Sequence, residues 1–198
     1  MDTLSWAREG AIVTGIDFSQ PTIAQARALA TELGIAARFV ESNLYDLPAN
    51  LSGEFEIVFT SYGALYWLPD IEGWARIAAG FVKPGGFLYV VDGHPGSALV
   101  HKEPYFPGAE PPASNDVGTY ADPDARFENT LEYGFQHTLG DIVTALIEAG
   151  LRIDFLHEFP FGGWQMVPEM VKGDDGYYRF PDEGRLPLLF SVKASKPA

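Results

Sequence analysis

The stretch AIVTGIDFSQ, residues 11–20, decides the fold because it carries an apolar strand directly into a helix. Residues Ala11–Ile16 are rich in β-branched side chains, which predicts a strand. Asp17 ends that strand, and Ser19 supplies a side-chain oxygen suited to an N-cap. Apolar residues then recur at helical spacing until Gly34, a residue suited to ending a helix: they are Ile23, Ala26, Ala30 and Leu33.

The same alternation of strand and helix continues along the chain. Apolar runs predict strands at Arg38–Val40, Phe55–Thr60, Phe87–Asp92, Leu151–Phe159 and Leu186–Val192. Asp70 is expected to cap one helix, which VKPGG at residues 82–86 ends with a turn, and Thr138 with Asp141 forms a capping box for another. This order predicts an α/β protein of three αβα layers, doubly wound around a mostly parallel sheet, in a single domain over residues 1–198. The run Phe55–Thr60 is expected to be covered on both faces.

Two long segments do not fit this alternation. His94–Gln136 is rich in Gly and Pro, and Pro160–Arg185 is aromatic and acidic. Because long loops in compact domains are usually functional or disordered, we expect residues 94–136 and 160–185 to be caps over a substrate pocket.

Composition narrows the classes of ligand. The net charge of −14 opposes binding to nucleic acid and to an anionic membrane surface. The absence of cysteine excludes disulfides and thiolate metal sites, and no set of residues has convincing metal-ligand spacing. No apolar run reaches the ~20 residues of a membrane span, and no secretory signal is visible. A cytoplasmic protein with a small-molecule partner is expected.

Asp17 is the first candidate for a binding residue. Ligands of open α/β sheets bind at the carboxyl ends of the strands, where an acid accepts hydrogen bonds from ribose hydroxyls. Phe18 is placed to pack on an adenine. The alternative is that Asp17 serves only as a turn or capping acid. NAD enzymes and methyltransferases both use such an acid, so Asp17 alone does not separate them.

Four quoted stretches in this order make a more specific pattern: DTLSWAREGAIVTGIDFS, RFVESNLYDLP, FEIVFTSYGALYWLPD and FVKPGGFLYVVD. The set resembles the seven-stranded, class I methyltransferases that depend on S-adenosylmethionine (SAM). The resemblance covers most of Asp2–Asp92 and is weaker beyond. It implies SAM as cofactor, with the ribose at Asp17.

The resemblance also implies further site residues. Asn43 and Leu44 would meet the adenine edge, although the family usually has an acid where Asn43 stands. Ser61 and Tyr62 would lie near the methionine part and the sulfonium, where an aromatic face stabilises a cation by roughly 0.5–2 kcal/mol. The alternatives are a turn role for Asn43 and a core position for Tyr62.

Methyl transfer depends mainly on alignment of the reacting atoms, and a base is needed only when the nucleophile must lose a proton. His94, just after the strand Phe87–Asp92, is the first candidate for that base, and His137 is the second. His101 and His157 are less well placed. For each of them the alternative is a structural histidine. Tyr62 is a second candidate for contact with the reacting groups.

Asp17 also raises a question about the start of the chain. In nucleoside-binding βαβ units the acid follows the glycine-rich turn by ~20 residues. The first strand and glycine-rich loop of the family are therefore expected to be absent from this chain, which would weaken SAM binding and leave sheet edges that a second copy, in a homodimer, could cover. Two other functions stay open: a non-catalytic binding protein of the same fold, and a nicotinamide-dependent oxidoreductase.

Overall fold

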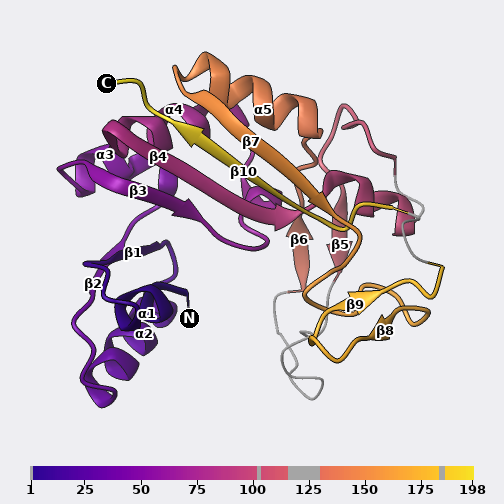
Figure 1. Ribbon diagram of the computed structural model, residues 1–198, viewed down its shortest axis with the longest axis horizontal. Helices are drawn as coiled ribbons and strands as arrows, with labels where there is room; N and C mark the ends of the chain where they lie inside the picture. The colour runs from indigo at the N-terminus through magenta and orange to yellow at the C-terminus, as the bar shows by residue number, and fades with distance from the viewer. Residues whose placement is uncertain (1, 102–103, 116–129, 183–185) are drawn as a thin grey trace. The chain divides into compact units, whose positions relative to one another are not determined.

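The computed structural model describes residues 2–101, 104–115, 130–182 and 186–198 (Figure 1). The chain divides into two compact units, residues 1–55 and 56–198, and each is described by itself. The single domain expected from the sequence stays a prediction. No helix in the described ranges is long and apolar enough to cross a membrane.

The first unit is built around two short parallel strands. Strand β1 pairs with β2 from Thr14 opposite Arg38 to Asp17 opposite Glu41. Its elements in chain order are α1 (Asp2–Arg8), β1 (Thr14–Asp17), α2 (Gln20–Glu32), β2 (Arg38–Glu41), the 3-10 turn η1 (Leu44–Asp46) and α3 (Leu47–Asn50).

Strand β1 begins three residues later than predicted. The N–H groups of Gly10 and Ala11 donate to Ala7 O at 3.0 Å and Trp6 O at 3.1 Å, so this backbone closes the end of α1 instead of joining the sheet. Ile12 is fully exposed in consequence. Helix α2, in contrast, has the predicted ends, because Ser19 accepts from Thr22 N and Gly34 follows with φ +64°.

The second unit contains a four-stranded sheet in the order β3-β4-β10-β7. Strand β10 runs antiparallel to both of its neighbours. The α/β class is confirmed, but the sheet of this unit is mixed, whereas the sequence predicted a mostly parallel one. The bounds are β3 (Phe55–Thr60), η2 (Leu65–Trp67), α4 (Ile71–Phe81), β4 (Val82–Gly93), η3 (Pro95–His101), β5 (Ala113–Asn115), β6 (Leu131–Tyr133), α5 (Leu139–Glu148), β7 (Arg152–Phe159), β8 (Val171–Lys172), β9 (Tyr178–Arg179) and β10 (Leu189–Ser195).

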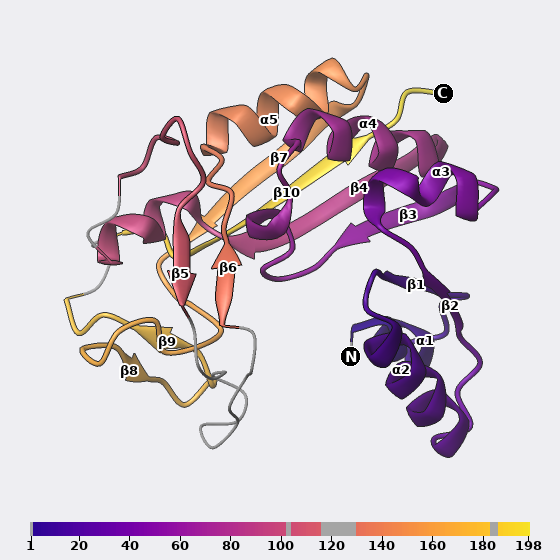
Figure 2. The same ribbon diagram turned by 180° about the vertical axis from the view of Figure 1, so that it is seen from behind.

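Helices α4 and α5 lie side by side on one face of this sheet (Figure 2). Both begin at the predicted caps: Asp70 accepts from Gly73 N, and Thr138 and Asp141 form the full capping box. Alternate residues of the central strands point into this layer. Leu88 and Val90 on β4 and Phe190 and Val192 on β10 are completely buried, so they form the core beneath the helices.

The predicted VKPGG turn is part of strand β4. Gly85 N donates to Lys196 O and Lys196 N donates to Gly86 O, both at 2.9 Å, so pairing with the chain after β10 extends into this segment. A side chain at Gly86 would stand 2.6 Å from Glu56 O, which explains the glycine there. The Lys196 ammonium donates to Ala79 O at 3.1 Å and Val82 O at 2.7 Å, which satisfies carbonyls at the end of α4.

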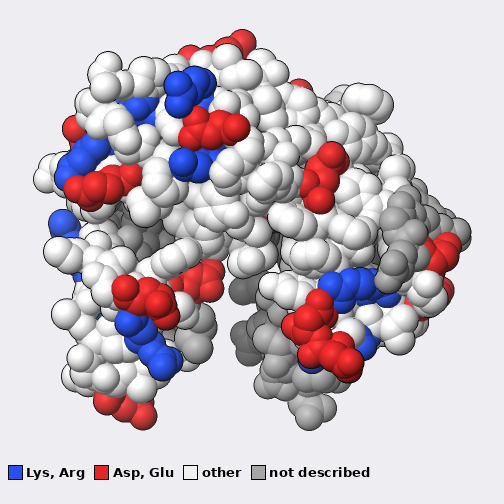
Figure 3. Space-filling view, viewed as in Figure 1, with Lys and Arg blue, Asp and Glu red and all other residues white. Residues whose placement is uncertain are grey.

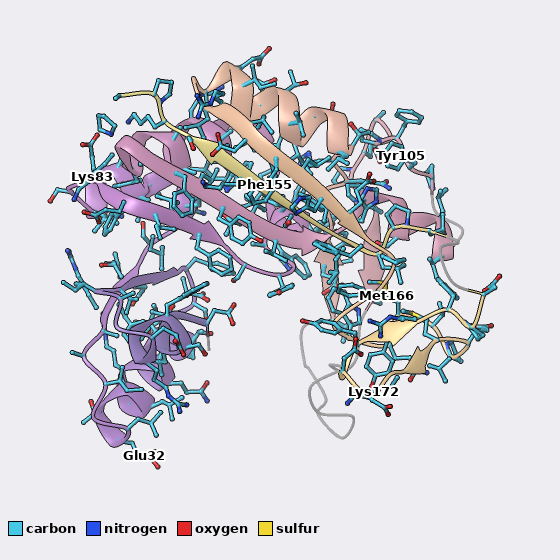
Figure 4. The ribbon with its side chains drawn as sticks, viewed as in Figure 1. Glu32, Lys83, Tyr105, Phe155, Met166 and Lys172 are labelled. Atoms are coloured by element: carbon cyan, nitrogen blue, oxygen red, sulfur yellow. The ribbon has the colours of Figure 1, made fainter. Side chains whose placement is uncertain are left out.

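The opposite face of the sheet carries a row of aromatic rings. The ring centre of Tyr89 on β4 lies 6.1 Å from that of Phe59 on β3 and 6.3 Å from that of Phe155 on β7. Phe155 is labelled in Figure 4. All three are half-buried. Ile57 on β3 is 55% exposed, so the prediction that Phe55–Thr60 is covered on both faces is wrong for this strand. Among the described residues, β4 is the only strand that pairs with β3.

The β8–β9 hairpin gives a test of pH dependence. Arg179 donates to both carboxylate oxygens of Asp175 and lowers the pKa of that carboxyl from 3.8 to about 2. A lowered pKa means that the pair stabilises the fold above pH 3.8 and that this contribution is lost as the pH falls through about 2. We therefore expect the carboxyl carbon of Asp175 to titrate near pH 2 in an NMR titration.

Replacing Arg179 with glutamine is expected to move that midpoint back toward 3.8 while leaving the fold intact. A midpoint near 3.8 in the unaltered protein would mean that the ion pair does not form in solution.

Candidate functional site

The carboxyl ends of β1 and β2 bring two of the predicted binding residues to one edge. Asp17 Oδ1 accepts from Ser19 N at 2.8 Å, and Asp17 O accepts from Ser42 N at 3.0 Å, one residue before Asn43. Asp17 therefore does shape the turn into α2, as the alternative interpretation expected. Its second carboxylate oxygen, Oδ2, has no protein partner in the described part of the chain and is available to a ligand.

The residues beside Asp17 differ in how open they are. Phe18 is 76% exposed, as a ring that packs on a ligand requires. Asn43 is exposed, but its side-chain carbonyl already accepts from Tyr45 N at 2.9 Å and caps η1. The turn role weighed for Asn43 is therefore present, and contact with an adenine amino group would have to share that oxygen. Leu44, the first residue of η1, is half-buried.

In the second unit, the candidates Ser61 and Tyr62 begin the segment that follows β3, residues 61–69, here called the post-β3 loop. Ser61 is half-buried, whereas Tyr62 is 51% exposed and is not a core aromatic. The far end of the loop is fixed by a neighbouring segment: Phe135 N donates to Tyr66 O, and His137 Nε2 donates to Leu68 O, each at 2.7 Å.

Sequence reasoning missed Asp92, the acid that fixes the near end of the post-β3 loop. Asp92 is 4% exposed and accepts from Gly63 N at 2.6 Å, Leu65 N at 3.0 Å and Gly93 N at 2.6 Å. Burial raises the pKa of the Asp92 carboxyl, and the hydrogen bonds from the backbone N–H groups oppose that rise. The signal was in the sequence, because Asp92 has the same parity on β4 as the buried Leu88 and Val90.

His94 continues the same parity and is buried for the same reason. It is 5% exposed, its Nδ1 accepts from Gly96 N at 2.9 Å, and its Nε2 lies 3.0 Å from Glu158 Oε1. The Nε2–Oε1 contact has the distance of a hydrogen bond without its alignment. Burial lowers the pKa of His94 more than Glu158 raises it. A neutral ring with both nitrogens facing protein groups fits the structural alternative better than contact with a substrate.

The remaining histidines serve structural contacts where they are described. His137 holds the post-β3 loop, and His157 stacks on Phe155 with ring centres 4.5 Å apart. The side chain of His101 is not among those that the structure describes. Within the described ranges, no group of three or more His, Asp or Glu side chains is arranged to hold a metal ion.

A cavity of about 450 Å³ lies between the start of α4, helix α5 and part of the predicted cap. Residues 107–112 and 135–137 form part of its lining, whereas Tyr62 is not among the lining residues. Two of its acids are already engaged: Glu72 lies 3.6 Å from Arg76, and Asp141 caps α5. The cap residues 102–103, 116–129 and 183–185 lie outside the described part of the chain.

The predicted site residues thus form two groups. Asp17, Phe18, Asn43 and Leu44 gather at one strand edge in the first unit, and Ser61, Tyr62 and His94 follow adjacent strands in the second. Acidic and basic side chains are interspersed on the face shown in Figure 3, without a continuous basic patch there.

Comparison with known proteins supports the class that these features suggest. Residues 1–86 match the family described as "Methyltransferase domain". The chain is 35% identical over 85 residues to the ubiquinone biosynthesis O-methyltransferase of Vibrio parahaemolyticus, an alignment that covers 43% of this chain and 36% of that protein. The chain therefore spans about a third of the length of the relatives that it matches.

Solved structures extend the likeness to nearly the whole chain. A SAM-dependent methyltransferase from Methanosarcina mazei has a TM-score of 0.61 at 19% identity, covering 98% of this chain and 86% of that one. The magnesium protoporphyrin IX methyltransferase of Synechocystis, solved with bound S-adenosylhomocysteine (SAH), has a TM-score of 0.57 at 16% identity, covering 98% and 68%.

The fold is therefore that of the SAM-dependent methyltransferases of class I. The match to the methyltransferase domain family covers residues 1–86, which contain β1, β2, β3 and the acid at the end of β1.

Proposed function

We propose that this protein is a SAM-dependent methyltransferase that acts on a small-molecule acceptor. The observation that carries the proposal is Asp17, which ends β1 with one carboxylate oxygen, Oδ2, without a protein partner in the described residues. An acid in that position suits two ribose hydroxyls, since a carboxylate can accept several hydrogen bonds. The family match over residues 1–86 supports a nucleoside cofactor of the SAM type.

Each unit contains an exposed aromatic ring and polar groups that fit a part of SAM. Asp17 would hold the ribose, Phe18 would pack on the adenine, and Asn43 and Leu44 would border it. SAM supplies a methyl group on a sulfonium sulfur. Tyr62 is exposed directly after β3 and offers a ring face to a cation, and Ser61 precedes it with a hydroxyl for the methionine part.

The proposed chemistry relies on positioning more than on a dedicated base. His94 is buried between Gly96 and Glu158, so we propose that it stabilises the chain just after β4 and does not act as a base. Aligning an acceptor with the methyl group can by itself supply ~7–11 kcal/mol. The family match covers the cofactor half of the chain, so the O-methyltransferase relatives support a hydroxyl acceptor only by analogy. The cap segments 94–136 and 160–185 are proposed to select the acceptor.

Calorimetric titration with SAM, SAH and NAD separates the candidate functions. We expect heat from SAM and SAH and none from NAD. Binding of NAD alone would favour the oxidoreductase, and binding of none of them would favour a non-catalytic protein of this fold. The affinity measured for SAM also tests the expectation that cofactor binding is weakened in this chain. The homodimer and the cytoplasmic location stay predictions.

A further inference from the structure

We infer that Asp92 is a positioning residue, whose carboxylate holds the post-β3 loop in the conformation that presents Tyr62 to the ligand. The inference rests on the proposed function for the identity of that ligand. Asp92 lies on β4, the strand beside β3, and its side chain is too buried to reach a substrate. Its role would therefore be to position the loop that follows β3.

The backbone of the loop forms a concave anion site for this carboxylate. Gly63 has φ +79°, a left-handed conformation, and the N–H groups that follow it turn toward one point. Asp92 Oδ1 accepts from Gly63 and Gly93, and Oδ2 accepts from Leu65. Three backbone N–H groups thus donate to the two oxygens of one carboxylate, which can accept all of them at once.

This arrangement is selective for a carboxylate. An asparagine of the same size would turn an NH₂ group toward at least one of these N–H donors, so one side of the cradle would become repulsive. An apolar residue would leave all of the buried N–H groups without an acceptor, and unpaired buried donors are unfavourable. Burying a charged carboxylate is unfavourable unless hydrogen-bond donors surround it. The presence of Asp92 among these donors therefore indicates that its carboxylate holds the backbone of the loop in place.

The loop leads directly to the proposed ligand contacts. Tyr62 immediately precedes Gly63, the first residue held by Asp92, and its ring is half exposed. The loop is anchored again at Tyr66 and Leu68 by residues 135–137. Tyr62 lies in the short stretch between the end of β3 at Thr60 and the anchor at Gly63, so the position of its ring depends on Asp92.

The test compares Asp92→Asn with Thr138→Ala, which removes the cap of α5 and lowers stability without removing any contact of Asp92. Hydrogen exchange of the ligand-free protein is the first measurement. In Asp92→Asn we expect the amides of Gly63, Leu65 and Gly93 to lose at least tenfold more protection than the amide of Val192 in β10. In Thr138→Ala the loop amides should lose no more than that of Val192.

Calorimetry with SAM is the second measurement, and we expect Asp92→Asn to bind about tenfold more weakly than Thr138→Ala. Equal loss of protection in the loop and β10, or a loosened loop with unchanged SAM affinity, overturns the inference. Unaltered protein that binds no SAM counts against the proposed function alone, and exchange then decides the role of Asp92. If Asp92→Asn does not fold, Gly63→Ala strains the same loop without a steric clash and should have the same two effects.

Discussion

Replacing Phe190 with alanine is expected to lower the free energy of unfolding by about 3–5 kcal/mol, the range for removal of a buried aromatic ring. Phe190 is completely buried on β10, beneath α4 and α5, and its ring meets the edge of His94 with centres 6.2 Å apart. β10 is hydrogen-bonded on both sides, so its backbone cannot move to fill the space left by the ring. Urea denaturation followed by circular dichroism measures the change.

Phe106→Ala is the matched control, because the ring of Phe106 is 71% exposed. We expect its effect to stay within about 0.5 kcal/mol, as for other surface substitutions. If the two variants are equally stable, Phe190 is not in the core that the structure shows.

The second large effect concerns the cofactor. Replacing Asp17 with alanine is expected to weaken SAM binding by about 1.5–3 kcal/mol, the contribution of hydrogen bonds to a charged group, or roughly tenfold to a hundredfold in the dissociation constant. The loss follows from Oδ2, which has no protein partner among the described residues and is proposed to accept from the ribose.

Glu32→Ala removes the same charge from the last residue of α2, at the end of the helix away from Asp17 (Figure 4). SAM affinity should be unchanged in that control. Circular dichroism of both variants checks that the turn into α2 survives the loss of the Ser19 contact. An Asp17→Ala variant that is folded and binds SAM as tightly as the original protein would show that the ribose does not lie at this acid.

Features set by a few neighbouring residues could be predicted from the sequence. The caps at Ser19, Asp70 and Thr138 all form as expected, because each depends on a side chain and an N–H group within three residues. Features set by distant chain segments could not. β10 pairs antiparallel with both β4 and β7, so its position depends on two strands that are distant in sequence. The residues of β10 itself do not reveal that position.

The candidate site shows the same division. Asp17 was found because the end of an apolar run is visible in the sequence, whereas the burial of His94 depends on which face of β4 the helices cover. Asp92 and His94 fall on the same alternate positions as the buried Leu88 and Val90. This spacing predicts that His94 is buried only if β4 is known to continue beyond Asp92. The cradle around Asp92 needs a loop from another strand and could not be read from either segment alone.

The place of β10 in the sheet has a consequence for how the protein is made. β10 is separated in sequence from β4 by residues 94–188, which include α5 and β7, and pairing between such distant segments is slow. Until that step, β4 and β7 each present an unpaired edge that can associate with another chain. The yield of native protein on refolding therefore depends on a competition between a first-order insertion and a concentration-dependent association, which dilution shifts toward the native state.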